Sequence, residues 1–165
     1  TEKNPLGVKR LFSESFPTKD GRASIGTIPN HVPSEQINEQ YPLYLTTGRV
    51  LEHYLTGVQT RHSPGLRSRV LEPFVQIHPD TAKRFGLQAH EMARLTSPRG
   101  NIQLRCHLSE KIRPDTLFVP FHWGGEQCIN RLTSHELDPR CKMPSFKVCA
   151  VDIRPANEKV NVDVK

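Results

Sequence analysis

Thr46-Thr47-Gly48-Arg49 is the first stretch of the sequence whose residue types suggest a binding chemistry. Threonine hydroxyls and the backbone N–H groups beside a glycine can approach a phosphate or the edge of a flat heterocycle closely, because glycine has no side chain in the way. Arg49 adds a forked cation that suits a pyrophosphate group. The same residues could equally form a tight turn with a surface arginine, so a binding loop and a plain turn both stay open.

Phe121-His122-Trp123-Gly124-Gly125 is the second such stretch, and Asn130 follows it closely. A histidine and a tryptophan at the end of a predicted strand, beside flexible glycines and an asparagine, can stack on a flat heterocycle and hydrogen-bond to its edge. The alternative is a glycine-rich loop over a partly buried tryptophan. Neither stretch identifies a ligand by itself.

The motifs of several common enzyme classes are absent from the sequence. There is no G-x-x-x-x-G-K-[ST] phosphate loop, no G-x-G-x-x-G turn, no G-x-S-x-G elbow and no H-E-x-x-H pair. Cys128, His135 and Cys141 lie close in sequence, but structural zinc normally uses tighter paired spacing and four ligands. We therefore expect no metal site there, and we expect Cys106 and Cys149, which fall in predicted strands, to be core thiols.

Charge and composition narrow the class of partner. The formal net charge is +6, from 23 basic and 17 acidic residues, and the basic residues form no block along the chain. This balance suits an anionic cofactor or an acidic protein surface better than nucleic acid, which is not expected as a partner. No apolar run approaches the roughly 18 residues of a membrane helix, so no membrane span is expected.

Two further features bear on cellular context. The four cysteines contain no C-x-x-C pair, which favours reduced thiols and a cytoplasmic location. The sequence begins Thr1-Glu2-Lys3-Asn4, without an initiator methionine or an apolar signal core. This beginning suggests either a processed product or, more simply, a piece of a longer chain.

The elements that must position these residues are short strands. Residues 1–40 are predicted to be an extended linker, because prolines punctuate them. Strands are predicted over residues 41–47, 74–77, 91–96, 101–108, 116–121 and 146–153, from β-branched or alternating apolar residues. A two-turn helix is predicted over 78–86, with Pro79 in its first turn and Gly86 at its end.

Two long loops connect these elements, over residues 49–72 and 122–145, and long loops in compact domains are often functional. The polar residues 156–165 are expected to form a flexible tail. Short strands with one short helix and long connections predict a small β-barrel with crossover connections.

The two stretches, together with other phrases of the sequence, resemble one protein family. The matching phrases are residues 16–23, 41–49, 78–82, 122–124, 130–133, 138–139 and 144–151. In order and spacing they are similar to the C-terminal domain of molybdopterin oxidoreductases that carry two molybdopterin guanine dinucleotides. The resemblance implies a mainly β fold, a double-psi β-barrel with short helices and long functional loops, over residues 41–155.

The same resemblance implies which residues bind the cofactor. They would be Thr46, Thr47, Gly48, Arg49, Val50, Leu51, Glu52, His53, Tyr54, Thr56, His122, Trp123, Gly124, Asn130 and Lys147. In this assignment His122 faces the pterin end, Asn130 bonds to the pterin ring, and Lys147 reaches the cofactor from the last strand. Arg61, Arg67 and Arg69 are expected to be solvated or to face other domains, with added positive charge near the cofactor as the alternative.

Within the family, Val50-Leu51-Glu52-His53 and the Phe-His-Trp-Gly run are most similar to nitrate reductases, particularly the cytoplasmic assimilatory type. Formate dehydrogenases share much of the pattern. Leu55 departs from the nitrate reductase version, in which a second histidine is common. The resemblance therefore implies nitrate reduction to nitrite by the intact enzyme, with formate oxidation as the alternative.

The family places its iron–sulfur cysteines and its protein ligand to molybdenum in earlier domains, and no such cysteine cluster occurs here. The isolated domain is therefore expected to be inactive, with the remaining domains of the catalytic subunit as its partners. Two alternatives stay open: a separate small binding subunit of a molybdenum or tungsten enzyme, and an adaptor of the same barrel shape that binds protein or peptide.

Overall fold

The computed structural model describes residues 7, 10–29 and 32–157. The chain divides into two units, Thr1–Val32 and Pro33–Lys165, and each helix and strand of the described residues lies in the second. In the first unit, Phe16 N–H donates to the Gly21 carbonyl, and the rings of Phe12 and Phe16 stack with centroids 5.2 Å apart. The second unit contains the candidate site.

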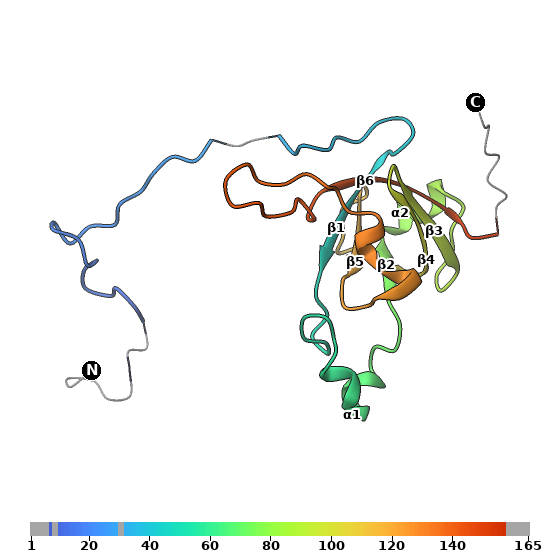
Figure 1. Cartoon of the computed structure of the whole chain (residues 1–165), viewed down its shortest axis with the longest axis horizontal. Coiled ribbons are helices and arrows are strands. Elements are labelled where there is room, and N and C mark those ends of the chain that lie inside the picture. Colours follow the sequence, from blue (N-terminus) through green and yellow to red (C-terminus); the bar gives the residue numbers. More distant parts are fainter. Residues whose placement is uncertain (1–6, 8–9, 30–31, 158–165) are drawn as a thin grey trace. The chain divides into compact units, whose positions relative to one another are not determined.

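Six strands of the described residues close into a barrel, in the order β1-β5-β2-β4-β3-β6 (Figure 1). They are β1 (Leu43–Gly48), β2 (Phe74–Ile77), β3 (Met92–Ser97), β4 (Gly100–Leu108), β5 (Thr116–Pro120) and β6 (Cys149–Pro155). β1 pairs with β5 and β2 with β4 in parallel, and the other neighbours are antiparallel. Parallel pairs require crossover connections. The barrel therefore confirms the predicted mainly β fold with crossovers.

Alternating side chains fill the barrel. In β4, Ile102, Leu104 and Cys106 face the interior and are almost fully buried, whereas Asn101 and Gln103 face outward. Each strand contributes in the same way, because successive side chains of a strand point to opposite faces. The strand residues that form the hydrophobic core are Leu43, Leu45, Val75, Ile77, Ala93, Leu95, Ile102, Leu104, Cys106, Leu117, Val119, Cys149, Val151 and Ile153.

The predicted short helix is present as α2 (Pro79–Arg84). His78 caps it, since its Nδ1 accepts from the Asp80 N–H at 3.2 Å. Gly86 ends it with φ +67°, a left-handed conformation that glycine adopts without strain. The long loops contain further helical turns that the sequence did not predict: η1 (Thr60–His62), α1 (Pro64–Arg67), η2 (Gly125–Gln127) and η3 (Ile129–Arg131).

The last strand starts later than the sequence predicts, at Cys149 instead of residue 146. Its antiparallel pairing with β1 ends at Leu45 opposite Cys149. Beyond that point Thr47 bonds to Phe146 and Lys147 through side chains, so the regular ladder cannot continue. β6 runs on to Pro155 at its other end, because β3 pairs with it there.

Part of the predicted linker contacts the barrel. Glu35 Oε1 accepts from Arg99 Nη2 and from the Ala150 N–H, both at 2.9 Å. The same arginine donates to the Leu132 carbonyl. One half-buried ion pair, with its hydrogen bonds, thus joins residues 33–40, the β3–β4 turn, the loop at Leu132 and β6. The predicted tail from residue 158 onward lies outside the described residues.

Candidate ligand-binding site

A cavity of about 790 Å³ lies where β1 and β5 end. Because these strands are parallel, their carboxyl ends and the loops that follow them emerge on the same side of the barrel. The segment just before β6 completes the wall. The lining residues are Thr47, Gly48, Arg49, Thr56, Phe121, Asn130, Thr133, His135, Pro144, Phe146 and Lys147.

Six of the residues that the sequence nominated meet in this cavity, although up to 100 positions separate them. They are Thr47, Gly48, Arg49, Thr56, Asn130 and Lys147. Barrel closure brings them together, since the loop after β1 and the segment before β6 lie on neighbouring strands. The convergence that the cofactor assignment required is therefore present for these residues.

Thr47 and Lys147 are joined by a reciprocal pair of contacts at the cavity wall. Thr47 Oγ1 donates to the Phe146 carbonyl at 3.0 Å, and Lys147 Nζ donates to the Thr47 carbonyl at 2.7 Å. The ammonium group also lies 5.3 Å from the centroid of the Phe146 ring. These contacts fix the position of the Lys147 charge at the end of β1.

Gly48 lies against an aromatic ring. A Cβ added at Gly48 would be 2.3 Å from Cε2 of Phe118, which is closer than carbon atoms can approach. The absent side chain therefore admits the Phe118 ring beside β1. The sequence suggested that Gly48 lets a ligand approach the backbone, and packing against Phe118 gives a second reason for a glycine at this position.

The charge of the cavity is positive. Arg49 and Lys147 line it, and its lining includes no aspartate or glutamate. Neither cation forms an ion pair within the described part of the chain; Arg49 has the Phe121 ring beside it, 6.0 Å from its guanidinium carbon. Cations without a carboxylate partner, set beside aromatic rings, suit an anionic ligand that carries flat rings.

His122 is not brought to the cavity. Its ring is 1% exposed; Nε2 accepts from the Val50 N–H at 3.0 Å, and Nδ1 bonds to the Leu55 carbonyl. Both ring nitrogens are thus engaged, so the ring has no polar atom to offer a ligand. His122 instead anchors the loop that follows β1, which differs from the direct cofactor contact we expected.

His53 has a similar buried position. Its Nε2 bonds to the Val70 carbonyl at 2.9 Å and its Nδ1 to Thr60 Oγ1 at 3.1 Å. The edge of its ring meets Trp123 with centroids 5.2 Å apart. His53 and Trp123 therefore pack the inside of the loop, and neither lines the cavity.

Arg61 is half-buried and hydrogen-bonded to another part of the chain, whereas a solvated or domain-facing residue was expected. Its Nη2 donates to the His122 carbonyl, and its guanidinium carbon lies 5.8 Å from the Trp123 centroid. A Cβ at Gly57 would be 3.1 Å from the same Nη2. Gly57, with φ +73°, thus leaves room for the arginine as well as turning the loop.

The other nominated residues do not line the cavity; they are Thr46, Val50, Leu51, Glu52, Tyr54 and Gly124. Leu51 is 102% exposed and Tyr54 is 62% exposed, so both project away from the barrel. Gly124 lines a separate cavity of about 780 Å³ beside β4. Leu51 and Tyr54 therefore offer no contact to a ligand in the cavity at the ends of β1 and β5.

Five lining residues were not among the nominated cofactor contacts, although Phe121 opens the second stretch and Thr133 lies in a matching phrase: Phe121, Thr133, His135, Pro144 and Phe146. Phe146 was placed in the final strand and taken as core, and His135 was weighed only as a zinc ligand. Pro144 and Phe146 belong to a phrase of the family resemblance, which was the one signal for them. No pattern in the sequence marks Phe121 and Phe146 as walls of one cavity.

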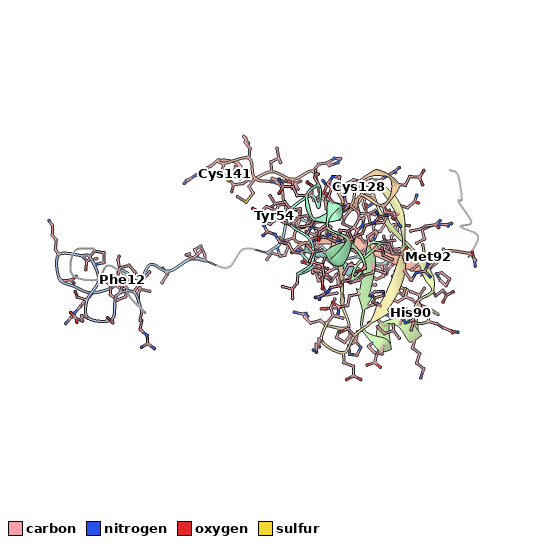
Figure 2. The ribbon with its side chains drawn as sticks, turned by 90° about the horizontal axis from the view of Figure 1, so that it is seen from below. Phe12, Tyr54, His90, Met92, Cys128 and Cys141 are labelled. Atoms are coloured by element: carbon pink, nitrogen blue, oxygen red, sulfur yellow. The ribbon has the colours of Figure 1, made fainter. Side chains whose placement is uncertain are left out.

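Figure 2 shows Cys141 on the loop that extends from the barrel, well apart from Cys128. No group of three or more His, Cys, Asp and Glu side chains in the described residues could hold a metal ion. All four cysteines are free thiols. None of the helices in the part of the chain that the structure describes has the length and apolar character needed to cross a membrane.

Comparisons with known proteins agree with this geometry. The model of the family described as "Molydopterin dinucleotide binding domain" matches residues 43–150. The chain is 52% identical over 156 residues to the assimilatory nitrate reductase catalytic subunit of Bacillus subtilis (strain 168), covering 93% of this chain and 22% of that subunit. It is 38% identical over 152 residues to the F420-dependent formate dehydrogenase subunit alpha of Methanocaldococcus jannaschii, covering 92% of this chain and 22% of that one.

Among solved structures, acetylene hydratase from Pelobacter acetylenicus matches with a TM-score of 0.61 at 21% identity. That match covers 71% of this chain and 19% of the hydratase. At this identity it supports the fold alone. The chain thus spans about a fifth of the length of the relatives it matches.

Proposed function

Because the chain belongs to the molybdopterin dinucleotide-binding domain family, we propose that the cavity at the ends of β1 and β5 holds a molybdopterin guanine dinucleotide. The observation that carries this proposal is the pairing of Arg49 and Lys147 in one cavity whose lining has no carboxylate. A dinucleotide pyrophosphate supplies the negative charge that these cations lack. The donor set of the cavity therefore fits the group.

We assign separate roles to the lining residues. Arg49 and Lys147 neutralise the phosphates, and the hydroxyl of Thr56 is placed to donate to them. Asn130 offers an amide to the edge of a ring system, and Phe121 and Phe146 present aromatic faces to it. His53 and His122 act indirectly, by fixing the loop that carries Arg49 and Thr56. The group supplies metal-centred redox chemistry when bound, while this chain contributes binding and orientation.

We propose that the intact protein is a catalytic subunit that reduces nitrate to nitrite in the cytoplasm. The 52% identity to the nitrate reductase subunit supports this substrate, and the 38% identity to the formate dehydrogenase subunit makes formate the second candidate. The relatives' greater length supports further domains that carry the iron–sulfur centre and cover the exposed loop around Leu51. The four free thiols support a reducing compartment.

The test is to measure cofactor content in the intact subunit carrying Arg49→Ala. A charge-assisted hydrogen bond contributes about 1.5–3 kcal/mol, so loss of one weakens cofactor binding by about 10- to 100-fold. Released guanine nucleotide and oxidised pterin fluorescence report occupancy independently of turnover. Lys111→Ala, which removes an exposed cation far from the cavity, is the matched control. Full occupancy in the Arg49 variant contradicts the assignment of this cavity.

A further inference from the structure

One buried imidazole closes the loop formed by residues 49–57. Val50 N–H donates to Nε2 of His122 at 3.0 Å, and the Leu55 carbonyl bonds to Nδ1. A carbonyl can only accept, so Nδ1 carries the hydrogen; a backbone amide can only donate, so Nε2 keeps its lone pair. The contacts of the loop therefore specify one neutral tautomer of His122.

Aromatic rings, and no carboxylate bonded to the histidines, fill the interior of the loop formed by residues 49–57 in the described structure. The rings of His53 and His122 have centroids 5.7 Å apart, and both contact Trp123. Within the described residues, no aspartate or glutamate forms a hydrogen bond or ion pair with either histidine, and this includes Glu52 of the same loop. A proton on His122 would therefore meet no carboxylate.

The charged groups that act on the His122 ring are all basic. Burial lowers the pKa of His122 below its ordinary value of 6.5; His53, Arg49 and Arg61 lower it further, whereas the bond to the Leu55 carbonyl acts in the opposite direction. A lowered pKa in the folded protein means that the neutral ring stabilises the fold fully above about pH 6.5. That stabilisation is lost as the pH falls through the folded-state pKa.

We propose that His122 is a positioning residue that holds residues 49–57 in their binding shape only while its imidazole is neutral. A second hydrogen on the ring would sit on Nε2, directly opposite the Val50 N–H, so one hydrogen bond is lost and two buried donors oppose each other. The loop then opens between Val50 and Leu55. Arg49 and Thr56, which flank this segment, leave the cavity together.

The consequence for the cofactor rests on the proposed function, whereas the opening of the loop does not. Mild acid should first open the loop in the chain itself. In the intact subunit, the same acid should then release the dinucleotide, since Arg49 no longer faces it. The two steps can be measured separately.

Nuclear magnetic resonance of the labelled 165-residue chain tests the first step. Between about pH 6.5 and the folded-state pKa of His122, the protection factor of the Val50 amide should fall about tenfold per pH unit. The amide of Leu104, in the barrel core, should keep its protection over the same range. Titration of the His122 ring with no change at Val50 overturns the proposal, and so does a ring that stays neutral until the whole chain unfolds.

Two variants sharpen this measurement. His122→Gln removes the titrating group but keeps an acceptor for the Val50 N–H and a donor for the Leu55 carbonyl, so the Val50 protection factor should no longer depend on pH over this range. Should that variant fail to fold, Arg49→Gln tests the same point, because it removes a cation that lowers the pKa of His122. The midpoint pH of the His122 ring titration and the midpoint pH of the loss of Val50 protection should then rise together. His62→Gln, at an exposed histidine of η1, should move neither midpoint.

Cofactor retention separates this inference from the proposed function. If acid opens the loop but the intact subunit keeps its dinucleotide, the site assignment has failed and the histidine mechanism stands. If Arg49→Ala removes the cofactor from the intact subunit but the Val50 protection factor does not change when His122 is protonated, the site assignment stands and the histidine mechanism has failed.

Discussion

The ammonium group of Lys147 donates to the backbone carbonyl of Thr47 at 2.7 Å, across 100 positions of sequence. The threonine returns a bond to the neighbouring Phe146 carbonyl. This pair of contacts places a cation at the end of β1 and shapes the wall of the cavity. It also explains why the final strand starts only at Cys149.

Lys147→Met should therefore separate the contribution of the ammonium group to stability from its contribution to cofactor binding. Methionine keeps the apolar stem and deletes the charge, so the free energy of unfolding should fall by at most about 1 kcal/mol for this exposed group. Cofactor content of the intact subunit should fall about tenfold or more, because a phosphate loses its cation. Lys111→Met serves as the control. Unchanged cofactor content in the Lys147 variant would show that the ammonium group serves Thr47 alone.

Gly48→Ala should destabilise the chain by about 1–3 kcal/mol, since the new methyl group collides with Phe118. Phe118 contacts the Phe74 ring, so it cannot move aside freely. Adding Phe118→Leu should recover part of the loss, which chemical denaturation measures. Gly65→Ala is the matched control, because nothing lies within 4 Å of the Cβ it adds. Equal stability of the two single variants would contradict the packing explanation.

Leu55→Asn should stabilise the chain slightly. Leu55 has φ +47°, a left-handed conformation that costs about 1–2 kcal/mol for most residues and that asparagine adopts more readily. Its side chain is 44% exposed, so little apolar burial is lost. Thermal unfolding should show Tm rising by one to a few degrees. Leu51→Asn, at a fully exposed position without positive φ, should leave Tm unchanged; a lower Tm for Leu55→Asn contradicts this account.

The cysteines should react in an order set by burial. Burial raises the pKa of Cys106 to about 11 and also raises the pKa of Cys149, so both are protonated thiols at pH 8. Cys141 is exposed and should be alkylated first, as mass spectrometry of the folded chain would show. Cys106 and Cys149 should react only after denaturant is added. Early labelling of Cys106 would mean that the barrel opens locally.

Local chemistry in the sequence was enough to predict the strands and the helix α2, although not the short helical turns of the long loops or the start of β6. Alternation in residues 101–108 predicted a half-buried strand, and Pro79 and Gly86 marked the helix that the structure has between them. Both signals arise within a few residues of chain. The short strands also predicted a small barrel, and the family resemblance added its double-psi type and the family's cofactor, because it draws on the order of many short phrases along the chain.

Tertiary structure decided which side chains reach the cavity. Arg49 and Lys147 line it, but His122, which the sequence also nominated, is buried as an anchor of the loop. Phe146 was predicted to lie in a strand and instead forms a wall. Such assignments depend on contacts between residues far apart in sequence, and barrel closure sets those contacts. The type of a residue determines which ligands it can bind. Its neighbours in the closed barrel determine which of its polar atoms remain free to contact a ligand.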